Sequence, residues 1–202
     1  MSKARLVVLI SGSGSNLQAL LDATATGALA AEIVAVISNR KAAYGLERAA
    51  QAGVPTIYFP LKPYRDDGRG REQYDLDLAA QIRDLRPDLI VLAGWMHIFC
   101  AEVINQFPRQ MINLHPALPG QFNGANAIER AFEAYQRGEV SGSGCMVHYV
   151  IPAVDEGPVI AQRELPFFPD DTLESYSARL HKAEHELIVE AVDVAVAGRR
   201  DA

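Results

Sequence analysis

The first half of the chain repeats a pattern of apolar run, polar turn and amphipathic segment. The first apolar run leads into Ser-Gly-Ser-Gly-Ser, and the segment that follows has leucines at helical spacing. Strands that alternate with helices indicate parallel pairing, and unbroken apolar runs indicate strands buried on both faces. We therefore predict an α/β fold with a doubly wound, mostly parallel sheet. The predicted strands are 5–10, 33–37, 56–59 and 88–93, and the predicted helices are 16–25, 44–53 and 72–85.

After residue 94 the pattern is less regular, with strands predicted at 110–114, 145–150 and 159–165 and helices at 127–137 and 172–197. The polar stretch 62–70 reads as a loop that is too short to separate two domains. We therefore expect a single domain over residues 1–202. Within it, an N-terminal half of about 1–95 would bind a nucleotide phosphate, and a C-terminal half of about 96–202 would carry the chemistry.

Composition narrows the class of protein. The 202 residues are 49% hydrophobic, the formal net charge is −6, and the two cysteines have neither disulfide-framework nor C-x-x-C zinc spacing. Nucleic-acid binding relies on clustered Lys and Arg, so a nucleic-acid partner is disfavoured. The apolar runs are too short to cross a bilayer and no basic-then-apolar leader is present, so we expect no membrane partner and a cytoplasmic location.

The glycine-rich loop between the first strand and the first helix is a candidate phosphate site. In Gly12-Ser13-Gly14-Ser15-Asn16, small residues allow backbone N–H groups at a helix N-terminus to reach an anion. The alternative is a plain turn with Ser15 as N-cap. A dinucleotide site is disfavoured because Leu17 replaces the third glycine of G-x-G-x-x-G, and the second strand ends in Ser-Asn-Arg instead of an acid. No P-loop motif is present.

Asn113, His115 and Asp155 are the candidate catalytic residues. Alternation along the predicted strand places Asn113 and His115 on one face, and Pro116 ends the strand so that His115 stands at its C-terminal tip. These residue types suit an amine attacking a carbonyl carbon. The amide and an imidazolium would stabilise the oxyanion, and Asp155 would keep the imidazole protonated without a metal. The alternatives are an exposed polar face on an edge strand and, for Asp155, an ordinary turn residue.

Several segments, in order along nearly the whole chain, resemble one enzyme family. They are Ser11-Gly-Ser-Gly-Ser-Asn16-Leu-Gln, Ser38-Asn-Arg, Ala93-Gly-Trp-Met96, Asn113-Leu-His-Pro116, Gly144-Cys-Met-Val-His148 and Val154-Asp155-Glu-Gly-Pro-Val-Ile160. Together they are similar to the phosphoribosylglycinamide formyltransferases, which belong to the wider 10-formyltetrahydrofolate-dependent formyltransferases. The resemblance implies a Rossmann-like formyltransferase fold. It also implies transfer of the formyl group of 10-formyltetrahydrofolate, as co-substrate, to the amine of 5-phosphoribosylglycinamide in purine biosynthesis.

The resemblance also implies roles for individual residues. The catalytic set is Asn113, His115 and Asp155; the substrate phosphate is held by Gly14, Ser15 and Asn16; the folate set is Arg71, Met96, His97, Ile98, Phe99, Asn113, Ile151, Pro152, Ala153, Val154 and Asp155. Two positions depart from the family pattern. After the catalytic histidine this chain has Pro-Ala-Leu-Pro-Gly, ending at Gly120, in place of Pro-Ser-Leu-Leu-Pro, and His97 stands where the family often has Arg.

Glu184 lies in the middle of the apolar arc of the last predicted helix. An unpaired buried carboxylate is costly, so Glu184 needs a partner. One expectation is an internal Arg or a backbone group. The other, implied by the resemblance, is that the ribose hydroxyls of the bound nucleotide supply the partner.

Other functions are compatible with parts of the same pattern. Hydrolysis of 10-formyltetrahydrofolate, or transfer to another amine, would use the same three catalytic residues. A nucleotide sensor would use only the glycine-rich loop. His181-Lys-Ala-Glu-His185 fits the H-x-x-E-H zinc pattern, but this leaves the other matching segments unexplained. We expect no bound metal and expect His148 to be a structural strand residue. The sequence leaves open whether the chain forms a homodimer.

Overall fold

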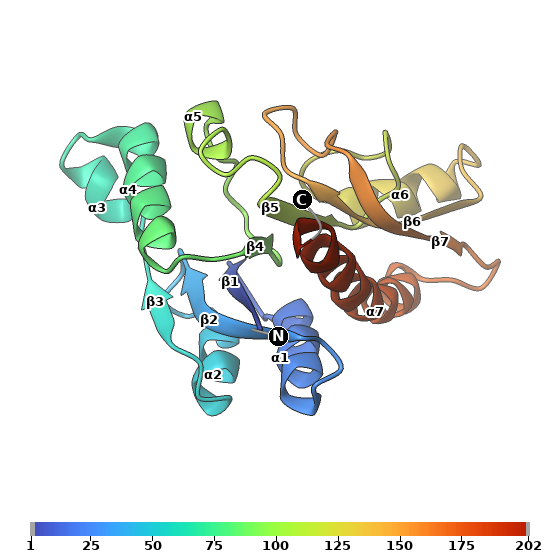
Figure 1. The fold of residues 1–202 in the computed structure, drawn as a ribbon. Helices are drawn as coiled ribbons and strands as arrows, with labels where there is room; N and C mark the ends of the chain where they lie inside the picture. The colour runs from blue at the N-terminus through green and yellow to red at the C-terminus, as the bar shows by residue number, and fades with distance from the viewer. Residues whose placement is uncertain (1–2, 201–202) are drawn as a thin grey trace.

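The computed structural model describes residues 3–200, and Figure 1 shows one twisted sheet with helices on both faces. The seven strands lie in the order β3-β2-β1-β4-β5-β6-β7. β1 to β5 pair in parallel, whereas β6 and β7 are antiparallel. The strands are β1 Ala4–Ile10, β2 Ala31–Ser38, β3 Thr56–Tyr58, β4 Leu89–Leu92, β5 Met111–His115, β6 Gly142–Tyr149 and β7 Val159–Pro166. The predicted doubly wound, mostly parallel fold is confirmed.

The seven helices divide between the two faces, since each face of the sheet has its own apolar core. Side chains of α1, α2, α6 and α7 enter one core, and side chains of α3, α4 and α5 enter the other. In β1, alternate residues face the two cores, and every residue from Leu6 to Ile10 is fully buried. The helices are α1 Ser15–Thr26, α2 Tyr44–Gln51, α3 Lys62–Asp66, α4 Gly70–Asp84, α5 Ala101–Ile104, α6 Ala127–Gln136 and α7 Leu173–Arg200.

The structure corrects three expectations. The stretch 62–70 is not a continuous loop, because α3 begins at Lys62 with a proline at its second position, where a missing N–H costs nothing. The short helix α5 was not predicted, since four residues are too few to show a periodicity. β5 lies between β4 and β6, so the alternative that placed Asn113 and His115 on an edge strand is wrong.

The sheet order brings the candidate site segments to one edge. β1, β4 and β5 are parallel neighbours, so their carboxyl ends lie side by side. The glycine-rich loop follows β1, the segment 94–99 follows β4, and His115 ends β5. Ser11 joins the first two segments, because its backbone N–H donates to the Gly94 carbonyl and its hydroxyl accepts from the Met96 N–H at 3.0 Å. Ligands of open α/β sheets bind at this edge.

Candidate active site

Asn113, His115 and Asp155 meet as predicted, with the Asp155 carboxylate at the centre. Asn113 Nδ2 donates to Asp155 Oδ1 at 3.2 Å, and His115 Nδ1 lies 3.3 Å from Asp155 Oδ2. The side chains of His115 and Asp155 are only 5% and 8% exposed. Asp155 stands in the turn between β6 and β7 with φ 57°, a left-handed conformation that Asp tolerates better than most residues. This backbone conformation directs the carboxylate back toward β5.

His148 is a site neighbour that the sequence pattern does not reveal. It pairs with Asn113 across β5 and β6, and its Nε2 lies 3.4 Å from Asp155 Oδ1 and 3.3 Å from Asn113 Nδ2. The ring is 2% exposed, and its Nδ1 faces the Tyr149 carbonyl at 3.0 Å. Strand alternation alone could not separate this histidine from a core residue. The antiparallel register that sets it opposite Asn113 is a tertiary fact.

Charge and burial act in opposite directions on this cluster. Burial by itself would raise the pKa of Asp155, but hydrogen bonding from His148 and from the Gly124 N–H, together with the charges of the two histidines, holds it below its ordinary value. Burial lowers the pKa of His115, and this outweighs Asp155 and the Phe122 carbonyl, which both act to raise it. This direction runs against the expectation that Asp155 keeps the imidazole protonated, because desolvation favours the neutral ring.

The ring of His115 lies between two acceptors. Nδ1 faces Asp155, and Nε2 lies 3.2 Å from the Phe122 carbonyl oxygen. A neutral imidazole carries one N–H and can satisfy only one of these oxygens. A proton that arrives during a reaction would complete the second hydrogen bond, so the site is built to accept one proton.

The glycine-rich loop enters α1 through Gly14, which has φ 70° and is the N-cap residue. A Cβ on Gly14 would lie 2.6 Å from Gly45 Cα, so the loop and the start of α2 approach as bare backbone. Ser15 is the first helical residue and not the N-cap, which corrects that alternative. The backbone N–H groups of the first turn of α1 therefore begin directly after the loop, where an anion can reach them.

Glu184 of α7 contacts Asn16, in the first turn of α1 after this loop. It is 4% exposed, and its Oε2 accepts from Asn16 Nδ2 at 3.4 Å and faces His181 Nδ1 at 2.9 Å. The expected arginine or backbone partner is wrong, because the two partners are an amide and an imidazole. The Glu184 hydrogen bond raises the pKa of His181 above its ordinary value, although burial opposes the change.

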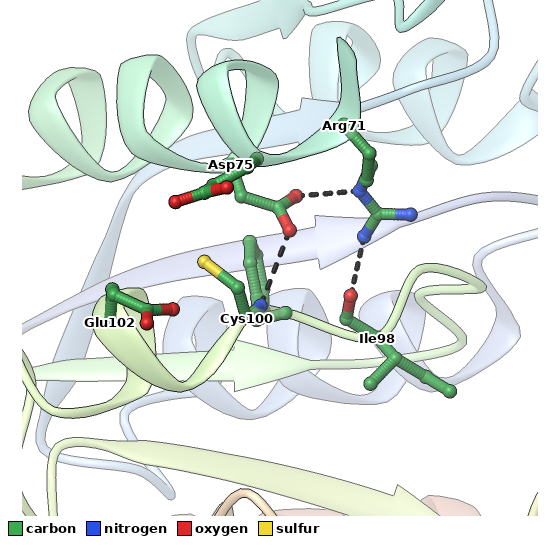
Figure 2. Close-up of a pocket in the computed structure, with 7 residues that line it drawn as sticks. Arg71, Asp75, Ile98, Cys100 and Glu102 are labelled. Atoms are coloured by element: carbon green, nitrogen blue, oxygen red, sulfur yellow. Dashed lines mark hydrogen bonds and ion pairs between the residues drawn. The ribbon is translucent and has the colours of Figure 1, made fainter.

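Figure 2 shows the Arg71 side chain extending from the start of α4 toward the segment that follows β4. Arg71 is one of the residues that line a hollow of about 350 Å³. Arg71 Nε donates to Asp75 Oδ1 at 2.8 Å, and one terminal nitrogen donates to the Ile98 carbonyl at 2.6 Å. The second oxygen of the buried Asp75 accepts from the Cys100 N–H at 3.3 Å. Arg71 and Asp75 thus fix the backbone of 98–100 while the Arg71 side chain stays 36% exposed.

The segment 96–99 presents an apolar rim next to Arg71. Met96 and Ile98 are 62% and 64% exposed, whereas Phe99 is buried and stacks on Trp95. His97 turns toward the sheet, where its Nε2 lies 2.8 Å from Asn39 Nδ2. Burial, followed by the charge of Arg71, lowers the pKa of His97 to about 4. His97 is therefore a neutral packing residue and does not replace the charge of a family arginine.

The predicted site residues form three groups and not one continuous contact network. Asn113, His115 and Asp155 form the first group, Asn16 with Glu184 the second, and Arg71 with Ile98 the third. Residues 151–155 lead into the first group, with Ile151 36% exposed. The common edge of the sheet, and not direct hydrogen bonding, relates the three groups.

The H-x-x-E-H pattern of α7 does not form a metal centre. Within residues 3–200, no three or more His, Cys, Asp or Glu side chains are grouped so that they could hold a metal ion. His181 of this pattern instead pairs with Glu184 of the same motif. No helix in the described part of the chain combines the length and the apolar character that crossing a membrane requires.

The chain is similar to known proteins along nearly its whole length. The formyl transferase family matches residues 4–192. The phosphoribosylglycinamide formyltransferase of Schizosaccharomyces pombe is 53% identical over 197 residues, which cover 94% of this chain and 95% of that protein. The enzyme of the same name from Dictyostelium discoideum is 47% identical over 196 residues, or 93% and 95% of the two chains.

A solved structure supports the same family assignment as the sequence comparisons. The crystal structure of glycinamide ribonucleotide transformylase 1 from Symbiobacterium toebii has a TM-score of 0.90 and 38% identity, and the match covers 98% of this chain and 89% of that one. Identity at this level over nearly the full length of both chains exceeds what a shared fold alone requires. The chain therefore belongs to the formyl transferase family and, within it, to the phosphoribosylglycinamide formyltransferases.

Proposed function

We propose that this enzyme transfers the formyl group of 10-formyltetrahydrofolate to the amine of 5-phosphoribosylglycinamide, a step of de novo purine biosynthesis. Family membership supports the reaction class, and one structural observation supports the chemistry. That observation is the buried Asp155 carboxylate, which holds both Asn113 and His115 at 3.2–3.3 Å. An amide and an imidazole fixed on one carboxylate suit a reaction that generates an oxyanion and releases a proton.

In the proposed chemistry the amine lone pair attacks the formyl carbon, and the carbonyl electrons move to oxygen to give a tetrahedral intermediate. Asn113 Nδ2 has two hydrogens. One is held by Asp155, and the other, which faces His148 at the longer distance of 3.3 Å, turns to the oxyanion. His115 accepts the proton that the amine loses, and Asp155 stabilises the imidazolium formed. The oxyanion electrons then re-form the carbonyl, the bond from carbon to the folate nitrogen breaks, and that nitrogen takes the proton from the His115 imidazolium.

We assign the nucleotide to the edge formed by the loop after β1 and by α7. The backbone N–H groups of Gly14, Ser15 and Asn16 would hold the phosphate, as the left-handed entry through Gly14 supports. Glu184 would accept hydrogen bonds from the ribose hydroxyls. It is already oriented by Asn16 and His181, so binding needs no rearrangement of a buried charge.

We assign the folate to the segment after β4 and to residues 151–155. Met96 and Ile98 offer exposed apolar surface for a flat heterocycle, while His97 and Phe99 support the segment from below. The exposed part of Arg71 suits a carboxylate of the folate, and its bonds to Asp75 and Ile98 pre-orient it. Pro152, Ala153 and Val154 would close the site beside Asp155. The proposed halves 1–95 and 96–202 therefore cooperate, since Arg71 and Glu184 each serve the other half.

The test follows folate absorbance in the presence of 10-formyltetrahydrofolate, with and without 5-phosphoribosylglycinamide. We expect loss of the formyl donor only when the nucleotide is present, with one formylated nucleotide formed for each donor consumed. Donor loss with release of formate in the absence of an amine would instead indicate hydrolysis. No reaction with this nucleotide, but reaction with another amine, would overturn the acceptor assignment.

The proposed compartment is the cytoplasm. Cys100 and Cys145 are the only cysteines of the chain and both are free thiols, as is usual in a reducing environment. Fractionation of the producing cells would test this assignment, and recovery of the protein in an oxidising compartment would contradict it.

A further inference from the structure

Arg130 of α6 contacts the loop behind His115 and is not part of the site proposed above. One terminal nitrogen of its guanidinium donates to the carbonyl oxygens of Phe122 and Asn123, at 2.5 and 2.7 Å. The Phe122 carbonyl is also the oxygen that faces His115 Nε2 at 3.2 Å. Arg130 and the catalytic histidine therefore share one acceptor.

The same loop also contacts Asp155. The Gly124 N–H donates to Asp155 Oδ2 at 2.8 Å, and Asn123 Nδ2 donates to the Val154 carbonyl at 3.3 Å. Residues 122–124 thus reach both His115 and the turn that holds its carboxylate partner. Arg130 connects this loop to a helix that is packed into the core through Ala131 and Phe132.

The loop has a backbone that needs such support. Phe122 has φ 48°, a left-handed conformation that is costly for a non-glycine residue unless its surroundings hold it there. Gly120 and Gly124, on either side, also have positive φ. This loop directly follows the Ala117 to Gly120 stretch in which the chain departs from the family pattern. The two hydrogen bonds from Arg130 hold Phe122 and Asn123 in this conformation.

Arg130 also acts on His115 through its charge. Four groups around the ring influence its proton: Asp155 from the turn after β6, the Phe122 carbonyl, His148 from β6 and Arg130 from α6. Asp155 and the carbonyl favour the imidazolium, while His148 and Arg130 disfavour it. Because Arg130 draws on the Phe122 carbonyl, it also competes with His115 for that acceptor.

We propose that Arg130 is a positioning residue of formyl transfer, holding the 122–124 loop so that His115 and Asp155 keep their contact. The inference rests on the proposed role of His115. It predicts an effect on kcat and on the pH profile, with little effect on substrate binding, since Arg130 contacts the loop and not the nucleotide or folate segments.

The experiment compares Arg130→Gln with Arg137→Gln, a matched control that removes the same charge just beyond the end of the same helix. Arg137 is exposed and pairs only with Glu139 among the described residues. For Arg130→Gln we expect kcat to fall about 10- to 100-fold, since a misplacement of about 1 Å can cost roughly 100-fold in rate, with both KM values within about twofold of wild type. The acid limb of kcat/KM should move to higher pH, because loss of a positive charge raises the pKa of His115. Arg137→Gln should change neither kcat nor the acid limb of kcat/KM.

Arg130→Lys keeps the charge on a shorter side chain with a compact ammonium group. It should return the acid limb to the wild-type position and give a kcat between those of wild type and Arg130→Gln. If Arg130→Gln does not fold, the kcat of Arg130→Lys is compared instead with that of Arg137→Lys. A kcat for Arg130→Lys equal to that of the control would then overturn the proposal. With a folded Arg130→Gln, an unchanged acid limb and kcat, or a loss confined to KM, would do the same.

Histidine NMR titration separates this inference from the proposed function. The His115 signal, assigned by its absence in His115→Gln, should titrate at higher pH in Arg130→Gln than in wild type, whether or not formyl transfer is observed. Absence of transfer by the wild-type enzyme would refute the proposed function. An unmoved His115 titration would refute the role of Arg130.

Discussion

Replacement of Asp155 by Asn is the sharpest test of the site, because it keeps the shape of the side chain and removes its charge. One carboxylate oxygen accepts from the Gly124 N–H and faces His115, and the other accepts from Asn113 and lies near His148. An amide has only one acceptor oxygen. Whichever way the introduced amide turns, its NH₂ group must therefore replace one acceptor oxygen. It then faces either Gly124 and His115 or Asn113 and His148.

The magnitude follows from the number of hydrogen bonds that the substitution removes. Hydrogen bonds to a charged group are worth about 1.5–3 kcal/mol each, and Asp155→Asn removes two of them in the state where His115 carries the proton. Each 1.4 kcal/mol is about a tenfold change in rate, so we expect kcat to fall about 10²- to 10⁴-fold. The KM for the nucleotide should change little, since Glu184 and the Gly14 loop lie on the other side of the site.

The pH dependence gives a second, signed outcome. Asp155 raises the pKa of His115 against the larger effect of burial, so its removal lowers that pKa further. A general base must be neutral, and the acid limb of kcat/KM should move to lower pH in Asp155→Asn. Steady-state kinetics across the range from acid to mildly alkaline pH measure both effects, with Asp170→Asn, the same change at an exposed turn residue, as control. An acid limb that moves to higher pH would refute the assignment of His115 as the proton acceptor.

Three further changes test other parts of the structure. Glu184→Gln should raise the KM for the nucleotide about 10- to 100-fold, through weaker hydrogen bonds to the ribose, and leave the KM for the folate unchanged; equal effects on both substrates in steady-state kinetics would contradict the assignment. Gly14→Ala should destabilise the fold by more than about 1 kcal/mol in urea unfolding, because φ is 70° and its Cβ would lie 2.6 Å from Gly45 Cα, whereas Gly12→Ala meets nothing within 4 Å and should be neutral. His97 has its pKa lowered from 6.5 to about 4, so the unfolded chain binds its proton first, and its contribution to stability is complete above pH 6.5 and lost as the pH falls to about 4. When the pH falls from neutral to about 4, the free energy of unfolding of wild type should therefore drop by up to about 3 kcal/mol more than that of His97→Gln. Urea titrations at the two pH values measure both drops, and drops of equal size in the two proteins would refute this.

The sequence by itself determined the order of the elements and the placement of the chemistry at the ends of strands. Apolar runs buried on both faces, such as 5–10, have few other solutions than a central parallel strand, so the doubly wound sheet could be predicted from local pattern alone. The alternation in 111–115 correctly gave Asn113 and His115 a common face. The apolar arc of α7 correctly marked Glu184 as a buried carboxylate. These signals are local, since a helix or strand period is written within about ten or twenty residues.

The tertiary structure alone decided which side chains contact each other and in which direction the pKa of each buried group is shifted. His148 reaches Asp155 only because β6 pairs antiparallel with β5 in one particular register, and Arg130 reaches His115 only through the folded 122–124 loop. The protonation of His115 also had to come from the fold. A nearby carboxylate predicts an imidazolium, but burial of the ring lowers the pKa of His115 and is the larger effect. Sequence patterns report which face a residue occupies, whereas desolvation depends on everything packed around it, and that is settled only when distant segments come together.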